Sequence, residues 1–414
     1  MCDTPSFRPH KSIGSWLQLS PDHLSEVPNG LCPTSLQSWL PLRERFRSSR
    51  ELMVMPGAAV YCMNAFLLSV VVIFIMVKIA PSIGLVDVPT ERKNHEGRIP
   101  LVGSGVFLAV CVTSILLQPS PRGILDFLIG MALIVLLGII DDVVDLRASI
   151  KFAAQCAVVA LMVLPNDFLI RNAGAILTDR PVLLLQWAAP VTIFAVVGVI
   201  NAVNLIDGLD GLAGGVSFVA LIWFAIAAAV LGLSEELLLI LVLAFGVLGF
   251  LVFNFRHPWR ARAAVFLGDA GSMMLGLALA FVAIILTQRS SHPLPPITAL
   301  WICALPVIDT LSLMIRRLAA GQSIVAVDHR HLHDLLVRAG FGVNHTVLIL
   351  VAVSGALGGI GIAGWLLHLP DRVMLIGLAV PIGIHSWFSC YGWKHLHVAT
   401  SGIPLTGGAV PQIK

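Results

Sequence analysis

Long apolar runs alternate with short polar segments along most of the chain. Each run is rich in Leu, Val, Ile and Ala and is a candidate membrane-spanning helix. The predicted spans are 57–80, 101–118, 123–140, 151–165, 183–200, 212–232, 236–253, 270–287, 296–318, 346–368 and 372–391. The pattern therefore predicts an all-α, polytopic membrane protein with about eleven transmembrane helices.

Composition supports this fold class and excludes others. Of the 414 residues, 57% are hydrophobic and 12% charged, whereas a soluble domain carries about 25% charged residues. The net charge of +3 is small, and no basic cluster has the interleaved aromatic residues of a nucleic-acid binder. The seven cysteines are scattered, which favours small buried side chains over disulfides.

The two ends differ from the middle of the chain. Residues 1–55 are rich in Pro, Ser and Arg, and we expect either a disordered tail or translation that begins at Met53 or Met55. A transmembrane transferase domain is expected over 56–391, and a cytoplasmic tail over 392–414. Among the loops, twelve Lys and Arg on one side face five on the other, which places the richer side in the cytoplasm.

Acidic residues and histidines gather in the loops of that same side. One-sided polarity indicates a site that meets a cytosolic reagent at the membrane surface, because an ion pathway would leave ionisable groups within the spans. Asp309 is the exception in mid-span. With Arg316 it forms either a structural pair, which we favour, or a snorkelling contact.

The third of these loops is the most unusual stretch. Asn201–Gly215 lies between two apolar runs yet holds two asparagines, two aspartates and several glycines. If it is a helix end, Asn204, Asp207 and Asp210 share one face, being spaced by three. The glycines would let a ligand approach the backbone. The alternative is a Gly-rich turn with solvated aspartates.

The second loop carries Asp141, Asp142 and Asp145 where a span ends. Three carboxylates this close repel one another unless a cation lies among them. Mg²⁺ suits oxygen ligands that it shares with phosphates, and Lys151 could hold a phosphate as a point charge.

The remaining loops offer groups for anions. Lys93 and His95 of the first loop could bind an anionic headgroup or serve as positive-inside anchors. In the fourth loop, Gly268–Ser272 opens a span, so its backbone N–H groups could face an anion. Asp269 there is either an N-cap or a metal ligand.

The fifth loop alternates His329, His331 and His333 around Arg330. This spacing does not match the usual zinc sites. It favours phosphate contacts, with a zinc site as the weaker alternative.

Together these loops resemble the polyprenyl-phosphate N-acetylhexosamine-1-phosphate transferases. The resemblance covers about residues 80–350 and rests on four motifs in the family's order. They are Asn201–Ala213, Gly138–Asp145, Phe266–Ser272 and His331–His333. The bacterial branch that it resembles most uses undecaprenyl phosphate and UDP-GlcNAc to start cell-surface polysaccharides. The resemblance implies transfer of a sugar 1-phosphate to a lipid phosphate with release of UMP, at the cytoplasmic face of the bacterial inner membrane.

The resemblance also implies residue roles. Asp269 and Asn204 would bind Mg²⁺, with Mn²⁺ as the alternative ion. The catalytic set would be Asp141, Asp142, Asp207 and Lys151. Asp141 and Asp142 would orient or deprotonate the lipid phosphate, although its second pKa near ~6 leaves it largely ionised already. The substrate-binding set would be Lys93, His95, Asn201, Asp210, Phe266, Arg330, His331 and His333. Among these, Phe266 would stack on uracil, and His331 and His333 would reach the pyrophosphate or sugar.

Two departures from the family pattern concern the fifth loop. Arg and His are exchanged at 329–330, and Asp334 stands where a third His is usual. The triple-His signature of the UDP-MurNAc-pentapeptide enzymes is missing, so we expect GlcNAc, with GalNAc or an N-acetylfucosamine-type sugar open. A transporter and a binding scaffold are the rival functions, and a homodimer is left open.

Overall fold

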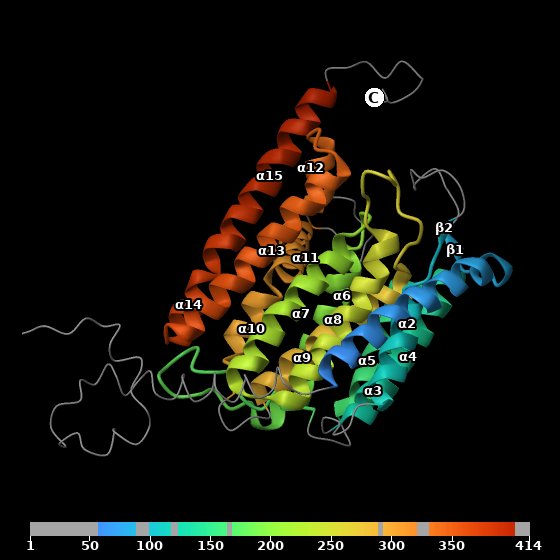
Figure 1. Ribbon diagram of the computed structural model, residues 1–414. Helices are drawn as coiled ribbons and strands as arrows, with labels where there is room; N and C mark the ends of the chain where they lie inside the picture. The colour runs from blue at the N-terminus through green and yellow to red at the C-terminus, as the bar shows by residue number, and fades with distance from the viewer. Residues whose placement is uncertain are drawn as a thin grey trace, which may run out of the picture.

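A computed structural model of the chain describes residues 57–87, 99–116, 123–163, 168–288, 293–319, 321 and 331–401. Most of these residues are helical (Figure 1). The helices are α2 (Ala58–Ile79), α3 (Ser104–Leu116), α4 (Ile124–Val144), α5 (Ala148–Val163), α6 (Ala188–Ile206), α7 (Leu212–Leu231), α8 (Ser234–Asn254), α9 (Gly268–Gln288), α10 (Pro296–Ile302), α11 (Ala304–Ala319), α12 (Leu332–Arg338), α13 (Val343–Leu366), α14 (Asp371–Gly377) and α15 (Ala379–Ser401). Two 3₁₀ turns cover Ala80–Ser82 and Leu185–Trp187, and the strands β1 (Val86–Asp87) and β2 (Ile99–Pro100) pair antiparallel.

Every predicted apolar run is a helix or a pair of consecutive helices. Within the described ranges, eight helices are long and apolar enough to cross a membrane, and the α10–α11 pair, bent by 81°, adds a ninth if it is one span. α3 and α5 are shorter apolar helices within the described residues, and each is followed directly by residues outside the described ranges. The protein is thus an all-α, multi-pass membrane protein, as its hydrophobic pattern predicts.

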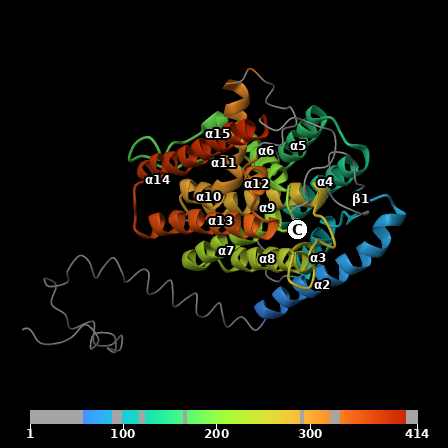
Figure 2. The ribbon, with the colours of Figure 1, turned by 90° about the horizontal axis from the view of Figure 1, so that it is seen from above.

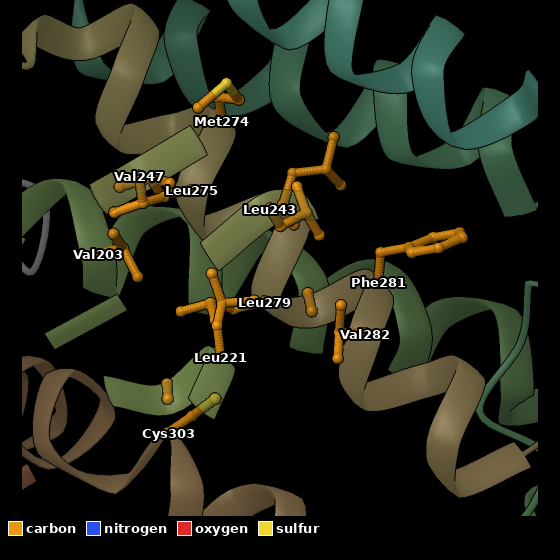
Figure 3. Close-up of a cluster of buried hydrophobic side chains, with 14 of the residues drawn as sticks. Val203, Leu221, Leu243, Val247, Met274, Leu275, Leu279, Phe281, Val282 and Cys303 are labelled. Atoms are coloured by element: carbon orange, nitrogen blue, oxygen red, sulfur yellow. The ribbon is translucent and has the colours of Figure 1, made fainter. Parts of the chain in front are cut away.

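Helix α9 lies at the centre of the bundle. Nearly every side chain between Ala270 and Thr287 is buried, and α9 packs against α4, α6, α7 and α8. Figure 3 shows side chains of α9 among Val203 of α6, Leu221 of α7 and Leu243 of α8. Seen from above, α2 and α14–α15 lie at opposite edges of the bundle (Figure 2). The surrounding helices therefore fix where the first residues of α9 emerge.

Two glycines let α9 touch its neighbours backbone to backbone. A Cβ atom added at Gly138 of α4 would lie 2.2 Å from the Cα of Ala270, and one at Gly276 of α9 would lie 2.5 Å from the Cα of Ile200 in α6. Small residues permit such close packing between membrane helices. The end of α4 and the end of α6 are consequently held beside the start of α9.

The strands β1 and β2, helix α12 and the segment between α8 and α9 lie at one end of the bundle, and residues 168–187 lie at the other (Figure 1). A short ladder joins the first loop to the fourth: Phe266 N–H donates to Pro100 O at 2.9 Å, and Val102 N–H donates to Phe266 O at 3.1 Å. The predicted residues Lys93, His95 and Arg330 lie outside the described residues, as does the 1–55 tail. The last predicted span ends at 391, whereas α15 continues to Ser401.

Candidate active site

Four helix ends bring acidic and amide side chains around one ammonium group. Lys151 in the first turn of α5 places its Nζ 2.7 Å from Asp141 Oδ2 and 2.9 Å from Asp269 Oδ1. The same Nζ donates to Asn204 Oδ1 at 3.2 Å. Asp141 is in the last turn of α4, Asn204 in the last turn of α6 and Asp269 in the first turn of α9. Residues far apart in the sequence thus form a compact set of oxygen atoms that holds a cation.

Asp142 has a different task from its neighbour Asp141. Its carboxylate accepts hydrogen bonds from the backbone N–H groups of Asp269 at 2.8 Å and Ala270 at 3.2 Å. The N–H groups at the start of α9 do face an anion, as their position predicts, and that anion is Asp142. Gly268 makes the approach possible, because its φ is +70° and a Cβ there would lie 2.8 Å from Asp142 Oδ2. Capping by Asp142 frees the Asp269 side chain to point at Lys151, so Asp269 is not the N-cap of α9.

The three aspartates of the second loop do not converge on one point. Asp141 is buried and accepts from Leu146 N–H at 2.9 Å as well as binding Lys151. Asp145 is exposed and ends α4 in the left-handed region with φ 54°. The repulsion expected among these carboxylates is therefore relieved by separation, by Lys151 and by the amides that hold Asp142.

The third loop begins as helix. Asn201 donates from Nδ2 to Gln155 Oε1 at 2.6 Å, and Gln155 Nε2 lies 3.0 Å from Met273 Sδ. One turn later, Asn204 Nδ2 donates to Asp269 Oδ1 and, at 2.8 Å, to Ser272 Oγ. Asn201 therefore ties α6 to α5 below the cluster, while Asn204 lies inside it.

The expectation that Asn204, Asp207 and Asp210 share one helix face is wrong. α6 ends at Ile206, Asp207 is its C-cap with ψ 55°, and Asp210 lies in the turn before α7. Asp210 Oδ2 accepts from Arg256 Nε at 2.6 Å and from Ala263 N–H at 3.1 Å. Glycines in this stretch end the helix early, and Asp210 is bound to the fourth loop instead.

Asp207 lies among the other carboxylates of the cluster. Burial, and then the carboxylates of Asp269, Asp142 and Asp210, raise the pKa of Asp207 well above its usual range. Lys151 and Arg256 neutralise part of the negative charge nearby. Among the described side chains of this cluster, five carboxylates (Asp141, Asp142, Asp207, Asp210 and Asp269) accompany two cations, Lys151 and Arg256. An additional cation would reduce the repulsion between the carboxylates.

Asn254 is a structural member of the site that sequence reasoning missed. It is buried at the end of α8. Its Oδ1 accepts from Gly211 N–H at 2.7 Å, and its Nδ2 donates to Val265 O at 2.8 Å. Gly211 has φ +83° and lies against the ring of Phe255, so this turn needs glycine. An asparagine closing an otherwise apolar run is the signal that could have identified it.

Phe266, the predicted uracil platform, lies in the segment leading into α9. Its backbone is fixed by the ladder to Pro100 and Val102, and its side chain is partly exposed. The main chain of Phe266 is thus fixed three residues before Asp269, and the role of its ring in stacking stays a prediction.

A second cluster centres on Asp309 in α11. Asp309 Oδ2 lies 2.7 Å from His331 Nδ1, and Asp309 Oδ1 lies 3.0 Å from His385 Nε2. Leu332 N–H also donates to Oδ1 at 3.1 Å. The partners of Asp309 are therefore two histidines, from the start of α12 and from α15, rather than the predicted Arg316. His385 carried no recognisable motif and was not predicted.

His333 connects this cluster to the third loop. The rings of His331 and His333 stack with centroids 5.5 Å apart. A Cβ added at Gly208 would lie 2.1 Å from His333 Nε2, and Asp334 Oδ2 is 3.7 Å from that nitrogen. The predicted residues His331 and His333 are both buried, and His333 lies directly against the turn between Asp207 and Asp210.

The donor atoms of the acidic cluster suit Mg²⁺. Among the residues that the structure describes, no three His, Cys, Asp or Glu side chains are grouped to hold a metal, which removes support for a zinc cage of described histidines. Asp269 and Asn204 supply hard oxygen atoms that already surround the Lys151 ammonium. Mg²⁺ commonly binds through one or two protein oxygens and completes its shell with phosphates and water, so the residues present fit it.

Comparisons with known proteins identify relatives of most of the chain. Residues 124–287, from α4 to α9, match the family described as Glycosyl transferase family 4. The chain is 32% identical over 351 residues to the undecaprenyl-phosphate alpha-N-acetylglucosaminyl 1-phosphate transferase of Escherichia coli (strain K12), covering 80% of this chain and 90% of the relative. It is 34% identical over 331 residues to the proteins of that name from Yersinia pestis and Haemophilus influenzae, covering 80% of this chain and 90% and 93% of theirs.

Proposed function

This chain belongs to glycosyl transferase family 4, and we propose that it transfers N-acetylglucosamine 1-phosphate from UDP-N-acetylglucosamine to undecaprenyl phosphate. An oxygen of the lipid phosphate forms a bond to the sugar-bearing phosphorus. The bond from that phosphorus to the oxygen of UMP breaks, and UMP leaves with the electron pair. The product is the lipid-linked sugar from which a cell-surface polysaccharide is built.

The observation that carries this proposal is the gathering of Asp141, Asn204 and Asp269 around one cation at the ends of four apolar helices. A lipid phosphate arriving from the membrane and a soluble nucleotide could meet there. Phosphoryl transfer depends mainly on positioning and on neutralising charge at the phosphate oxygens. Rigid helix ends provide the positioning, and Lys151 neutralises part of the charge on the phosphate oxygens.

Magnesium completes the charge balance in this proposal. Asp269 and Asn204 would hold the ion, which when bound supplies positive charge to the pyrophosphate oxygens. Lys151, 2.9 Å from Asp269, then has a phosphate oxygen as an additional partner. Asp142 acts by fixing the start of α9, because its two oxygens accept hydrogen bonds from the backbone N–H groups of Asp269 and Ala270.

The nucleotide half of the donor is assigned to the fourth loop. Phe266 offers a partly exposed ring, and Asp210, fixed by Arg256 and Ala263, offers a carboxylate to the nucleoside. His331 and His333 face the pyrophosphate or sugar from the other side of Gly208. With this arrangement we assign the protein to the bacterial inner membrane with the site in the cytoplasm, on the Lys and Arg bias of its loops.

A transporter is not favoured. The relatives are transferases by name, and the carboxylates of the site lie at helix ends, with Asp141 in the last turn of α4, Asp207 after α6 and Asp269 in the first turn of α9. The bent α10–α11 pair is the feature that a transporter would share. Uptake of a UDP-sugar into proteoliposomes without UMP release would favour transport over transfer.

The deciding experiment follows UMP. Purified protein is incubated with Mg²⁺, undecaprenyl phosphate and either UDP-GlcNAc, UDP-GalNAc, a UDP-N-acetylfucosamine-type sugar or UDP-MurNAc-pentapeptide. UMP released only when UDP-GlcNAc and the lipid are both present supports the proposal. Release with another sugar corrects the donor, and absence of release with every donor overturns the function.

A further inference from the structure

The carboxylate of Asp309 joins three segments that the sequence keeps apart. It is 2% exposed, and each of its oxygens contacts an imidazole, one from His331 and one from His385 of α15. A carboxylate buried at this depth is costly unless it is paired, so such groups in membrane proteins usually serve a site. Apolar side chains would join α11 to α15 at a lower energetic cost.

The contact with His331 has a consequence for the ring. Because Nδ1 faces the carboxylate at 2.7 Å, the plane of the imidazole is fixed and Nε2 is the nitrogen left for other partners. The ring of His333 stacks on it with an interplanar angle of 8°. Fixing His331 therefore also fixes the position of His333.

His333 in turn lies against the turn of the acidic cluster. The space that a side chain at Gly208 would need is filled by the His333 ring. Gly208 follows Asp207 directly and precedes Asp210 by two residues. A continuous set of contacts thus runs from His385 through Asp309, His331 and His333 to the turn between two aspartates of the site.

We infer that Asp309 is a positioning residue that aligns His331 and His333 toward the donor pyrophosphate, and that His385 of the last long helix holds Asp309 in place. This inference rests on the proposed function. It extends the site to α11, α12 and α15, beyond residues 124–287 that match the family. α15 thereby becomes part of the donor-binding machinery as well as part of the bundle.

The test separates the donor from the lipid. Asp309→Asn keeps the shape of the side chain but removes its charge, so its charged contacts with the two histidines weaken. The KM for UDP-GlcNAc should rise about tenfold, the effect of losing one charge-assisted hydrogen bond. The KM for undecaprenyl phosphate should stay within about twofold, because the histidines are assigned to the donor. A mere loss of folded protein would lower the rate but change neither KM. An unchanged donor KM overturns the inference.

One variant controls for simple loosening of the contacts between α11 and α15, and two variants test His385. Ser312→Ala removes a hydroxyl of α11 that lies 3.4 Å from Ser386 Oγ of α15. Ser312 is one turn from Asp309, and Ser386 is next to His385 in the sequence. It should leave both KM values unchanged. His385→Leu should raise the donor KM, and His385→Gln, which retains an N–H donor, should restore part of it. A Ser312→Ala protein with the same donor defect as Asp309→Asn contradicts the inference.

A double-mutant cycle asks whether Asp309 acts through His331. In a His331→Ala background, Asp309→Asn should raise the donor KM by less than twofold further, because the group it positions is gone. Additive increases would assign Asp309 a role unconnected with the histidine.

Binding of UDP-GlcNAc, measured by calorimetry without the lipid, keeps this inference distinct from the proposed function. Wild-type protein that binds UDP-GlcNAc tightly, and Asp309→Asn protein that binds it about tenfold more weakly, support the positioning role even if no UMP is released. Equal affinities in the two proteins overturn it even if UMP is released. Absence of binding by wild-type protein overturns both the inference and the assigned donor.

Discussion

The acidic cluster and the histidine cluster have opposite charge patterns. In the first, the Lys151 ammonium is surrounded by oxygen atoms of Asp141, Asn204 and Asp269. In the second, the Asp309 carboxylate lies between two imidazoles. In the proposed function, the first cluster would bind cations that accompany phosphate, and the second would hold imidazoles that donate toward an anion. Their meeting point is the turn at Gly208.

The clusters also differ in how they are held. The acidic cluster lies at the start of α9, the central helix, whose backbone contacts α4 and α6. The histidine cluster depends on α15 at one edge of the bundle (Figure 2). We therefore expect changes in the acidic cluster to affect chemistry most strongly and changes in the histidine cluster to affect donor binding.

Metal removal should have the largest effect. With EDTA, UMP release should fall to background, because the excess carboxylates lack the ion that neutralises the donor pyrophosphate. Adding Mg²⁺, or Mn²⁺ less effectively, should restore it. The thermal midpoint should change little, since Lys151 already binds Asp141 and Asp269. Full turnover after exhaustive chelation would contradict the magnesium assignment.

Asp269→Ala should lower UMP release by about 10²–10³-fold, the loss typical of removing a key electrostatic group from an active site. The protein should elute as a single species, because α9 remains buried and Asp142 still caps it. The matched control is Asp145→Asn, an exposed aspartate of the second loop that should turn over within about twofold of wild type. Retained turnover in Asp269→Ala would remove this residue as a metal ligand.

Gly208→Ala tests the meeting point of the clusters. The added methyl group collides with His333, since a Cβ there would lie 2.1 Å from Nε2. We expect about a tenfold loss in kcat/KM, in line with an overpacking cost of ~1–3 kcal/mol. In a His333→Ala background the same change should cost less than twofold. Equal losses in the two backgrounds would show that the clusters are independent.

Asn254→Ala should have the smallest effect on turnover. It removes the acceptor of Gly211 N–H and the donor to Val265 O, leaving two main-chain groups without these partners. A stability loss of about 1–3 kcal/mol is expected, visible as a lower thermal midpoint. A few-fold increase in the KM for UDP-GlcNAc should accompany it, and Asn254→Gln tests whether a longer amide can rejoin the turn.

The helices and the acidic residues could be predicted from the sequence for clear reasons. Hydrophobic length determines membrane helices because unpaired backbone groups are costly in hydrocarbon. Polar residues such as Asp141 or Asn204 stand out where an apolar run ends. Their helix register was harder to predict: α4 continues to Val144 and α6 to Ile206, so both reach into their motifs.

The sequence could not show which side chains or backbone groups each site residue contacts. Asp142 looks identical to Asp141 in a string of letters, yet it binds the backbone of a helix 127 residues away. His385 lies 76 residues from Asp309, and no fixed spacing marks such a pair. The packing of α11 against α15 brings Asp309 and His385 together, and this packing cannot be read from the spacing of residues in the sequence.

The contact between Gly138 and Ala270 fixes how far α9 can slide along α4. Gly138 lies one helical turn before Asp142, so any sliding of α9 against α4 would displace the capping carboxylate from the amides it holds. The alignment of the capping carboxylate thus depends on a backbone contact one turn earlier in α4. A methyl group added at Gly138 would press on the backbone of Ala270 and Asp269, and we expect it to lower the rate of UMP release.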